Sequence, residues 1–468
     1  MSFKKNFFKN LLVSGGYNYL SQLVTFVASF ITSRLLTPND FGLIGLIAVF
    51  SGFITIFSDS GLSMAIIRSD YRQTYYRGLN FLSLLIGTLL CVTMIVLIYP
   101  ISFFYTNREL ILPGIAIAFL FIIKSLSVVP MAVLQKELRF GFVGRILLIS
   151  TLIGTFSSII MAYGGFKYWS LIWSQYITAI VSSFILYKST PGLYTKTRIA
   201  VIKKSFLFAR TLISSLMGFN VVNYWARNAD NLIVGKYYGT ADLGIYNRAY
   251  MMLMMPLNLI TGIFSSVLLP SFVKHKREGG DIESEYYFIL KVISLVNFPV
   301  SVILLLFPQK LVLLLWGQSW ISVANLLPYF GLLVLTQTLT STLGNLLVLQ
   351  KEEKTLIITG WVSSIFMVAG IIIGSFFSLW FIAALYTLAY LLLVLPFSIT
   401  YVFFIKLKFV KGIVEFWVPR ISLSLIMWFA IYKDIYNLLF IAVIIWVIMM
   451  LWEARLSIGK VITYVKSF

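Results

Sequence analysis

Histidine and cysteine are nearly absent from this chain of 468 residues, which contains one of each, His275 and Cys91. A single cysteine excludes a disulfide within the chain and argues against a cysteine-based metal site. His275 lies in a charged stretch between Lys274 and Arg277, which is typical of a solvated loop. The sequence therefore predicts neither a metal site nor a bound cofactor.

Charged residues are also scarce, since they make up only 11% of the chain while 60% of it is hydrophobic. This composition excludes an ordinary soluble domain. Apolar runs near 20 residues recur along the whole length, and each can cross ~30 Å of hydrocarbon as a helix. We predict an all-α polytopic membrane protein with about fourteen transmembrane helices. The expected spans are residues 11–32, 41–62, 79–103, 110–134, 142–163, 168–187, 208–234, 243–269, 286–307, 322–348, 355–376, 380–404, 416–432 and 435–452.

Motifs for catalysis and for nucleotide hydrolysis are missing. The sequence has no His–carboxylate cluster, no phosphate-binding glycine loop, no adjacent nucleophile–base pair and no Walker motif. Of the sixteen acidic residues, only Asp59 and Asp230 fall inside the expected spans. We therefore predict that the chain is not an enzyme and that it does not hydrolyse ATP by itself.

Basic residues are abundant, and their distribution follows the expected membrane topology. The side that carries both termini holds 26 of the 37 Lys and Arg residues, whereas the other side holds six. Cytoplasmic loops of membrane proteins are enriched in Lys and Arg, so both termini are predicted to be cytoplasmic. The net charge of +21 is then a topology signal and a contact for anionic lipid head groups, and nucleic acid is not an expected partner.

An internal repeat relates Ser33–Leu43 to Gly235–Ile245, 202 residues later. At this offset a cation aligns with a cation, an Asp with an Asp and a Gly with a Gly, and Asn18 aligns with Asn220. Six spans per repeat would insert both halves the same way up, related by a pseudo-two-fold axis along the membrane normal. A membrane protein with two homologous halves is most often a transporter whose substrate path lies between them.

The repeat defines the expected domains, which are joined by the basic connection 188–204. Residues 1–200 form an N-terminal lobe with helices one to six. Residues 201–412 form a C-terminal lobe with helices seven to twelve. Residues 413–468 add two further helices that lie outside the repeat.

Polar residues inside two equivalent spans carry the functional prediction, because their spacing of three or four places them on one helix face. Such groups are costly in lipid and therefore face protein or water. One polar face in each half predicts a shared hydrated cavity. Span seven contributes Asn220, Asn223, Arg227, Asp230 and Asn231, and span one contributes Asn18, Ser21, Gln22, Thr25 and Ser29.

Several intramembrane charges have two interpretations. Asp230 and Arg248 lie at similar depths in adjacent spans, so they can form a structural ion pair or face the cavity. Arg227 is either a cavity cation or a member of an Arg–Asp–Arg cluster. Lys124, near the middle of span four, either extends toward the cytoplasm or faces the cavity. Arg420, close to a cytoplasmic helix end like Lys291, is expected to extend its charge to the membrane surface.

Two runs in the centre of the chain, Ala226–Lys236 and Leu243–Tyr250, stand out together with Gly239 and Pro256. They resemble the signature of Wzx-type polysaccharide flippases, in the multidrug/oligosaccharidyl-lipid/polysaccharide exporter superfamily. The stretches Arg34–Gly42, Asp59–Leu62 and Gln135–Phe140 are similar to the same group. The resemblance covers residues 10–400 and is most specific at Arg227–Asn231.

The resemblance implies two six-helix bundles around a central cavity, with spans one and seven at the interface of the lobes. It implies movement of undecaprenyl-pyrophosphate-linked oligosaccharide from the cytoplasmic to the periplasmic leaflet of a bacterial inner membrane. The implied partners are this substrate, membrane lipids, and a polysaccharide polymerase with its chain-length regulator. Asn and Gln suit sugar hydroxyls, and cations suit phosphate oxygens. An inside-negative potential favours outward movement of the anion, although proton or sodium antiport stays open.

Three alternatives were weighed. A cation-coupled multidrug exporter should have cavity carboxylates, whereas the candidate groups here are mostly cationic. A flippase for a lipid-linked peptidoglycan precursor shares the mechanism and stays open. A glycan polymerase or ligase would need a large periplasmic loop, and the longest outward loop has roughly fifteen residues.

Overall fold

The computed structural model describes residues 3–59, 61–68, 73–195, 197–263, 281–410 and 412–466, and these ranges are helical without any β-strand. Eleven helices in them are long and apolar enough to cross a membrane. They coincide with expected spans two to six and nine to fourteen, while spans one, seven and eight fall on α1 and α8. The all-α membrane fold is confirmed, and the count of fourteen stays a prediction. The expected loop with His275 lies outside the described residues.

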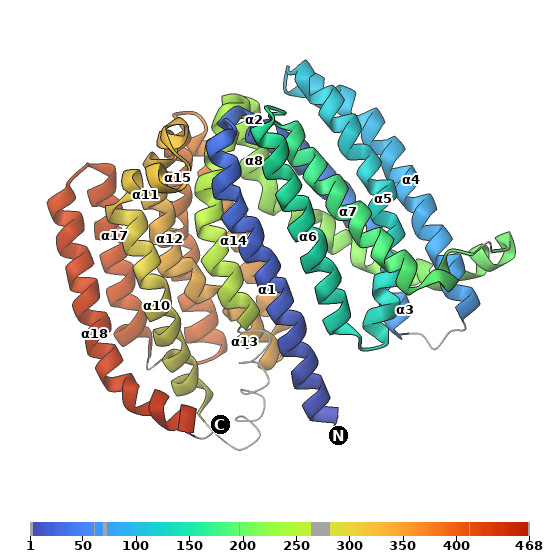
Figure 1. Cartoon of the computed structure of the whole chain (residues 1–468). Coiled ribbons are helices and arrows are strands. Elements are labelled where there is room, and N and C mark those ends of the chain that lie inside the picture. Colours follow the sequence, from blue (N-terminus) through green and yellow to red (C-terminus); the bar gives the residue numbers. More distant parts are fainter. Residues whose placement is uncertain are drawn as a thin grey trace. The chain divides into compact units, whose positions relative to one another are not determined.

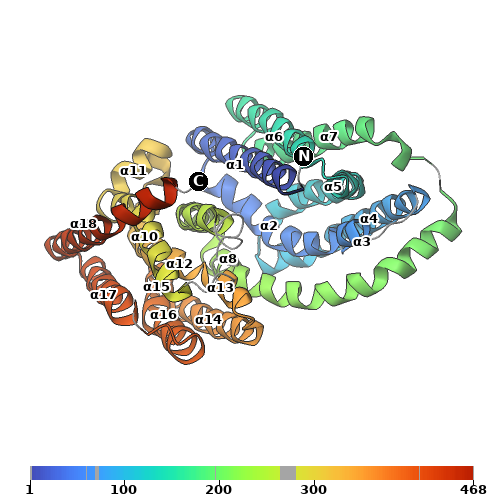
Figure 2. The ribbon, with the colours of Figure 1, turned by 90° about the horizontal axis from the view of Figure 1, so that it is seen from below.

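The chain divides into two compact units, residues Met1–Gly244 and Ile245–Phe468. In the first unit α6 packs between α1 and α7, and α5 packs between α7 and α4 (Figures 1 and 2). The helices of this unit are α1 (Phe3–Leu35), α2 (Pro38–Asp59), α3 (Leu62–Arg68), α4 (Gln73–Phe104), α5 (Ile111–Lys136), α6 (Phe140–Tyr163), α7 (Trp169–Ser189) and the part of α8 (Ile199–Ile263) up to Gly244.

The turn between α1 and α2 is fixed by a reciprocal capping box. The Asp40 carboxylate accepts hydrogen bonds from the Thr37 backbone N–H at 2.9 Å and from its hydroxyl at 2.7 Å, while the Asp40 N–H donates to Thr37 Oγ1 at 3.3 Å. Pro38 suits the first helical position because it has no N–H to satisfy. Buried Asp40 also accepts from the Tyr168 N–H, 3.2 Å away, and so ties this turn to the one before α7.

Two glycines at equivalent positions of the repeat pack against each other's turn. A Cβ built on Gly42 would lie 1.6 Å from Thr240 O, and one built on Gly244 would lie 2.0 Å from Pro38 O. Pro38 and Thr240 are themselves 202 residues apart, so the contact is reciprocal. Only glycine permits this backbone approach. Within α8, Gly239 has φ +83°, which interrupts the helix where the sequence separates spans seven and eight.

The second unit surrounds a core of α10, α12, α17 and α18, where Leu335, Met427 and Trp446 are buried (Figure 1). The two C-terminal helices therefore pack on the helices of the second repeat. The helices of this unit are α10 (Ile282–Leu306), α11 (Pro308–Leu315), η4 (Gln318–Asn325), α12 (Leu327–Thr340), α13 (Leu343–Leu349), α14 (Glu353–Gly374), α15 (Leu379–Ala389), α16 (Leu395–Ser398), α17 (Val418–Tyr432) and α18 (Tyr436–Lys466), with π-helical turns at 390–394, 399–406 and 413–417.

Arg420 corrects one sequence-based expectation, because its side chain is fully buried instead of reaching the membrane surface. Its guanidinium binds both oxygens of Glu453, with Nη2–Oε2 at 2.6 Å and Nη1–Oε1 at 3.2 Å, and Nη1 also donates to Phe416 O at 2.9 Å. The expected last span ends at residue 452, one residue before this partner. A buried charge is tolerated when it is paired and hydrogen-bonded, as here.

Candidate functional site

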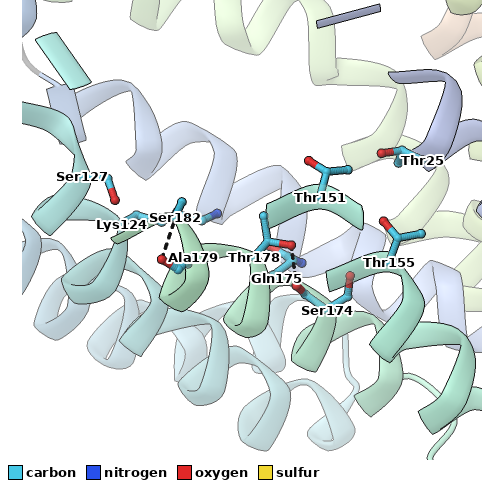
Figure 3. Close-up of a pocket in the computed structure, with 10 residues that line it drawn as sticks. All are labelled: Thr25, Lys124, Ser127, Thr151, Thr155, Ser174, Gln175, Thr178, Ala179 and Ser182. Carbon is cyan, nitrogen blue, oxygen red and sulfur yellow. Dashed lines mark hydrogen bonds between the residues drawn. The ribbon is translucent and has the colours of Figure 1, made fainter. Parts of the chain in front are cut away.

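A polar cavity of about 340 Å³ lies inside the first unit, between α1, α5, α6 and α7 (Figure 3). All but one of its ten lining residues have polar side chains, although they sit on apolar helices. The lining residues are Thr25, Lys124, Ser127, Thr151, Thr155, Ser174, Gln175, Thr178, Ala179 and Ser182. The cavity can therefore offer many hydrogen bonds to a ligand in the middle of a hydrophobic unit.

Lys124 is the only charged residue in this lining. It is on α5, and its amino group extends past Ser182 in Figure 3. Within the described residues it forms neither an ion pair nor a hydrogen bond, so its three donors are available to a ligand. Its side chain lines this cavity of the first unit, while its role in a cavity shared by the two halves stays a prediction.

Three of the seven hydroxyl groups in this lining are oriented by their own helices. Thr25 Oγ1 donates to Ser21 O at 3.0 Å, and Thr178 Oγ1 donates to Ser174 O at 2.8 Å. Ser182 Oγ donates to Ala179 O at 3.0 Å. These bonds occupy the hydroxyl protons and leave the oxygens as acceptors. The Gln175 side chain has no hydrogen bond to any described residue, so it can both donate and accept.

The charge of the cavity favours an anionic, hydroxyl-rich ligand. Its lining contains one cation and no carboxylate. The Lys124 ammonium can form charge-assisted hydrogen bonds with phosphate oxygens, and the surrounding hydroxyl and amide groups suit sugar hydroxyls. An organic cation would find no counter-charge among these residues.

The remaining candidate residues of the N-terminal polar face lie on α1. Asn18 and Gln22 are exposed, and they precede the cavity residue Thr25 by about two turns and one turn of helix. The Ser21 and Ser29 hydroxyls donate to Tyr17 O and Phe26 O, at 2.9 Å and 2.7 Å. The structure thus brings together Thr25 and Lys124, while Asn18 and Gln22 are not among the lining residues.

The candidates on α8 are placed only in part. Asp230 is buried, and one of its oxygens accepts from the Asn231 N–H at 2.8 Å, while Asn231 Oδ1 is buried and has no hydrogen-bond partner among the described residues. Arg248, in the second unit, is buried with its guanidinium carbon 5.4 Å from the centre of the Trp320 ring. Its pairing with Asp230 stays a prediction. The side chains of Asn220, Asn223 and Arg227 lie outside the described residues.

Sequence reasoning missed the part of the cavity that α6 and α7 supply. Thr151 and Thr155 on α6 are four residues apart, and Ser174, Thr178 and Ser182 on α7 follow the same spacing. The spacing rule that was used for spans one and seven would have found both stripes if it had also been applied to α6 and α7. They were overlooked because isolated Ser and Thr are common in membrane helices, where they bond to their own backbone.

Comparison with known proteins places this geometry in context. The family described as "Polysaccharide biosynthesis protein" matches residues 31–325. Teichuronic acid biosynthesis protein TuaB of Bacillus subtilis is 24% identical over 63% of this chain and 61% of its own length. Lipopolysaccharide biosynthesis protein WzxC of Escherichia coli is 24% identical over 68% and 64%. The matched part of the chain thus spans less than two thirds of both relatives.

Solved structures share the fold at low sequence identity. The lipid II flippase MurJ in its inward closed conformation has a TM-score of 0.71 at 14% identity, covering 96% of this chain and all of that one. An inward-facing multidrug transporter of the MATE family has a TM-score of 0.58 at 14% identity, covering 79% and 92%. The arrangement of helices is therefore shared with these two proteins.

Proposed function

Because the chain belongs to the polysaccharide biosynthesis protein family, we propose that it moves lipid-linked oligosaccharide across a membrane. The substrate would be a saccharide repeat unit on undecaprenyl pyrophosphate, carried from the cytoplasmic to the periplasmic leaflet of the bacterial inner membrane. The observation that carries this proposal is the cavity with Lys124, which provides a cation, hydroxyls and an amide but no carboxylate. The names of the relatives, which include a succinoglycan biosynthesis transport protein, support the same substrate class.

The proposed mechanism follows from the two parts of the substrate. The pyrophosphate and sugars cross the membrane in a polar cavity, where Lys124 offsets part of the negative charge. The polyprenyl tail stays in lipid, because moving it through a polar cavity would lose its apolar burial. Alternating access exposes the cavity first to one side and then to the other. Arg227, Asn220, Asn223 and the other α8 candidates are proposed to contribute on the second repeat.

Two other functions are weaker on the same observations. A multidrug exporter fits the likeness to the MATE transporter, but the described cavity lacks the carboxylate that an organic cation requires. A peptidoglycan-precursor flippase fits the likeness to MurJ, and it would use the same cation for the same pyrophosphate. Family membership favours polysaccharide precursors over this candidate. No catalytic step is part of the proposal.

The direct test is to remove the protein and follow its substrate. Cells without the gene should lose surface polysaccharide and accumulate the lipid-linked repeat unit on the cytoplasmic face, because synthesis continues while translocation stops. Accumulation is measured by lipid extraction and by protection of the glycan from an added periplasmic glycosidase. Restoring the gene should reverse both changes. Normal surface polysaccharide in the deleted strain would contradict the proposal. Accumulation of the peptidoglycan precursor instead of the polysaccharide repeat unit would also contradict it.

Topology gives a second test, which concerns the proposed cytoplasmic termini. In a Cys91→Ala background, Thr240→Cys should react with an impermeant thiol reagent in intact cells, whereas Arg198→Cys should react only after lysis. The reason is the excess of Lys and Arg around residue 198, which favours the cytoplasmic side. Labelling of position 198 but not of position 240 in intact cells would reverse the proposed orientation.

A further inference from the structure

A second cavity, of about 620 Å³, lies in the second unit where α17 turns into α18. This α17–α18 pocket is also bordered by the start of α11, the end of η4 and the first turns of α12 and α15. Helix ends, rather than helix middles, form its wall, so it opens at one end of the helical unit. In the proposed topology that end is extracytoplasmic, because Lys433 and Lys310 belong to the sparsely basic face.

Aromatic rings line one side of the α17–α18 pocket. The rings of Tyr329 and Trp380 are nearly parallel, with centroids 6.4 Å apart and an interplanar angle of 20°, and Tyr432 lies 6.2 Å from Trp380. Trp428 stacks on Tyr432 from behind, with centroids 5.3 Å apart, and its Nε1 donates to Ala384 O at 3.0 Å. The rings are thus held in place by one another, and Trp380 keeps 37% of its surface exposed. Such a surface suits the apolar C–H face of a pyranose ring.

Polar side chains line the same pocket. Gln309, Asn325 and Asn437 are exposed and have no hydrogen bond to any described residue. Each amide both donates and accepts, as a sugar hydroxyl does, so three unpaired amides can bind several hydroxyls. They come from three separate elements, α11, η4 and α18, and therefore approach a ligand from different directions.

Asp434 adds a single carboxylate that the turn holds in place. Its φ is +54°, and the turn is closed by the Ile435 N–H donating to Ala430 O at 2.8 Å. Asp tolerates this left-handed conformation better than most residues with a Cβ. The same residue therefore fits the turn and places a hydrogen-bond acceptor in the pocket. A carboxylate can accept hydrogen bonds from two adjacent hydroxyls of one sugar ring.

The charged groups of this pocket differ from those of the cavity around Lys124. Its lining contains the Asp434 carboxylate and no Lys or Arg, while Lys433 and Lys310 lie over the Tyr432 and Phe307 rings that line it. Every other lining side chain is uncharged, which suits a neutral ligand. Its volume lies within the range of about 300–1,000 Å³ that is usual for small-ligand sites.

We propose that the α17–α18 pocket binds uncharged sugar residues of the glycan on the extracytoplasmic side. The source of the glycan rests on the proposed function, because a translocated repeat unit would present its sugars there. Gln309, Asn325, Asn437 and Asp434 hydrogen-bond the hydroxyls, while Trp380 and Tyr432 contact the C–H face of the ring. Capture of the sugars at this site would favour release of the substrate on the outer side.

The test measures sugar binding without transport. The full chain, purified into lipid nanodiscs, is mixed with neutral oligosaccharides prepared by depolymerising the producing bacterium's own surface polysaccharide, and binding is followed by saturation-transfer NMR. We expect transfer to ring protons of the sugar in the unaltered protein. Trp380→Leu and Asp434→Gly should each weaken binding by about tenfold or more, since each removes one contact to the ring or its hydroxyls.

Controls separate this proposal from misfolding and from failure of the proposed function. Gly adopts positive φ freely, so Asp434→Gly keeps the turn while it removes the carboxylate. Lys188→Ala should leave sugar binding unchanged, because this residue at the end of α7 lines neither cavity. Absence of transfer from every oligosaccharide, transfer unaffected by both pocket variants, or selective binding of tetramethylammonium instead of sugar would overturn the sugar site. Each of these outcomes leaves the gene-deletion result as it stands.

Discussion

Reversing the charge at Lys124 is expected to abolish polysaccharide export. Lys124→Glu would put a carboxylate into a cavity whose other lining groups are uncharged, and it would repel the pyrophosphate that Lys124 is proposed to bind. Lys124→Ala should lower export at least tenfold, because a charge-assisted hydrogen bond is worth about 1.5–3 kcal/mol. Lys124→Arg should keep part of the export activity, since the positive charge remains although the guanidinium differs in shape from the ammonium group. Surface polysaccharide, normalised to membrane protein, is the measurement.

Two comparisons make the Lys124 result specific. Lys188→Ala removes a cation that lies over the Phe184 ring at the end of α7 and should export normally. Ser182→Ala removes one hydroxyl from the cavity but no charge, and it should have a small effect on export. If Lys124→Glu protein accumulated normally in the membrane and exported at the unaltered rate, the cavity would not be the phosphate site.

Loss of Glu453 should destabilise the second unit more than any other single removal of charge. Glu453→Ala would leave the fully buried Arg420 without its counter-ion, and breaking a buried pair in this way costs about 3–5 kcal/mol. The joint replacement Arg420→Met with Glu453→Leu should recover most of that loss, because it removes both charges and keeps apolar volume between α17 and α18. The difference in the free energy of unfolding between the variants is measured by titration with a denaturing detergent.

An exposed ion pair in the first unit is the matched control for this prediction. Arg139 and Glu137 approach to 3.9 Å, and their side chains are 48% and 54% exposed. Glu137→Ala should therefore change stability by less than about 1 kcal/mol. Equal losses for Glu137→Ala and Glu453→Ala would mean that burial does not set the strength of the Arg420 pair.

The spans were predictable because hydrophobic length alone decides which segments can cross a membrane. Charge distribution and the repeat led to the expected orientation and internal symmetry, which both stay predictions. The partner of Arg420 was missed because Glu453 lies one residue beyond the expected span. The two residues are 33 positions apart, and their contact depends on helix packing that local sequence does not encode. Rules for single helices cannot find a pair formed across two of them.

The candidate site was predictable only in its general chemistry. Lys124 and Thr25 were identified because charged or regularly spaced polar groups are unusual in lipid-spanning helices. The stripes on α6 and α7 become part of a site only because these helices pack beside α1 and α5. The α17–α18 pocket had no sequence signal, since its residues come from helix ends spread over 135 positions, from Leu305 to Phe440.

The reciprocal packing of Gly42 and Gly244 also bears on how such a chain could arise. Two copies of one half, associating as a homodimer, would form this contact with the same glycine on both sides. In that ancestor a single substitution would have introduced two clashes at once, which makes the glycine hard to replace. After gene duplication and fusion, each copy mutates separately. The two turns have since diverged, to Pro38-Asn39 and Thr240-Ala241, while both glycines remain.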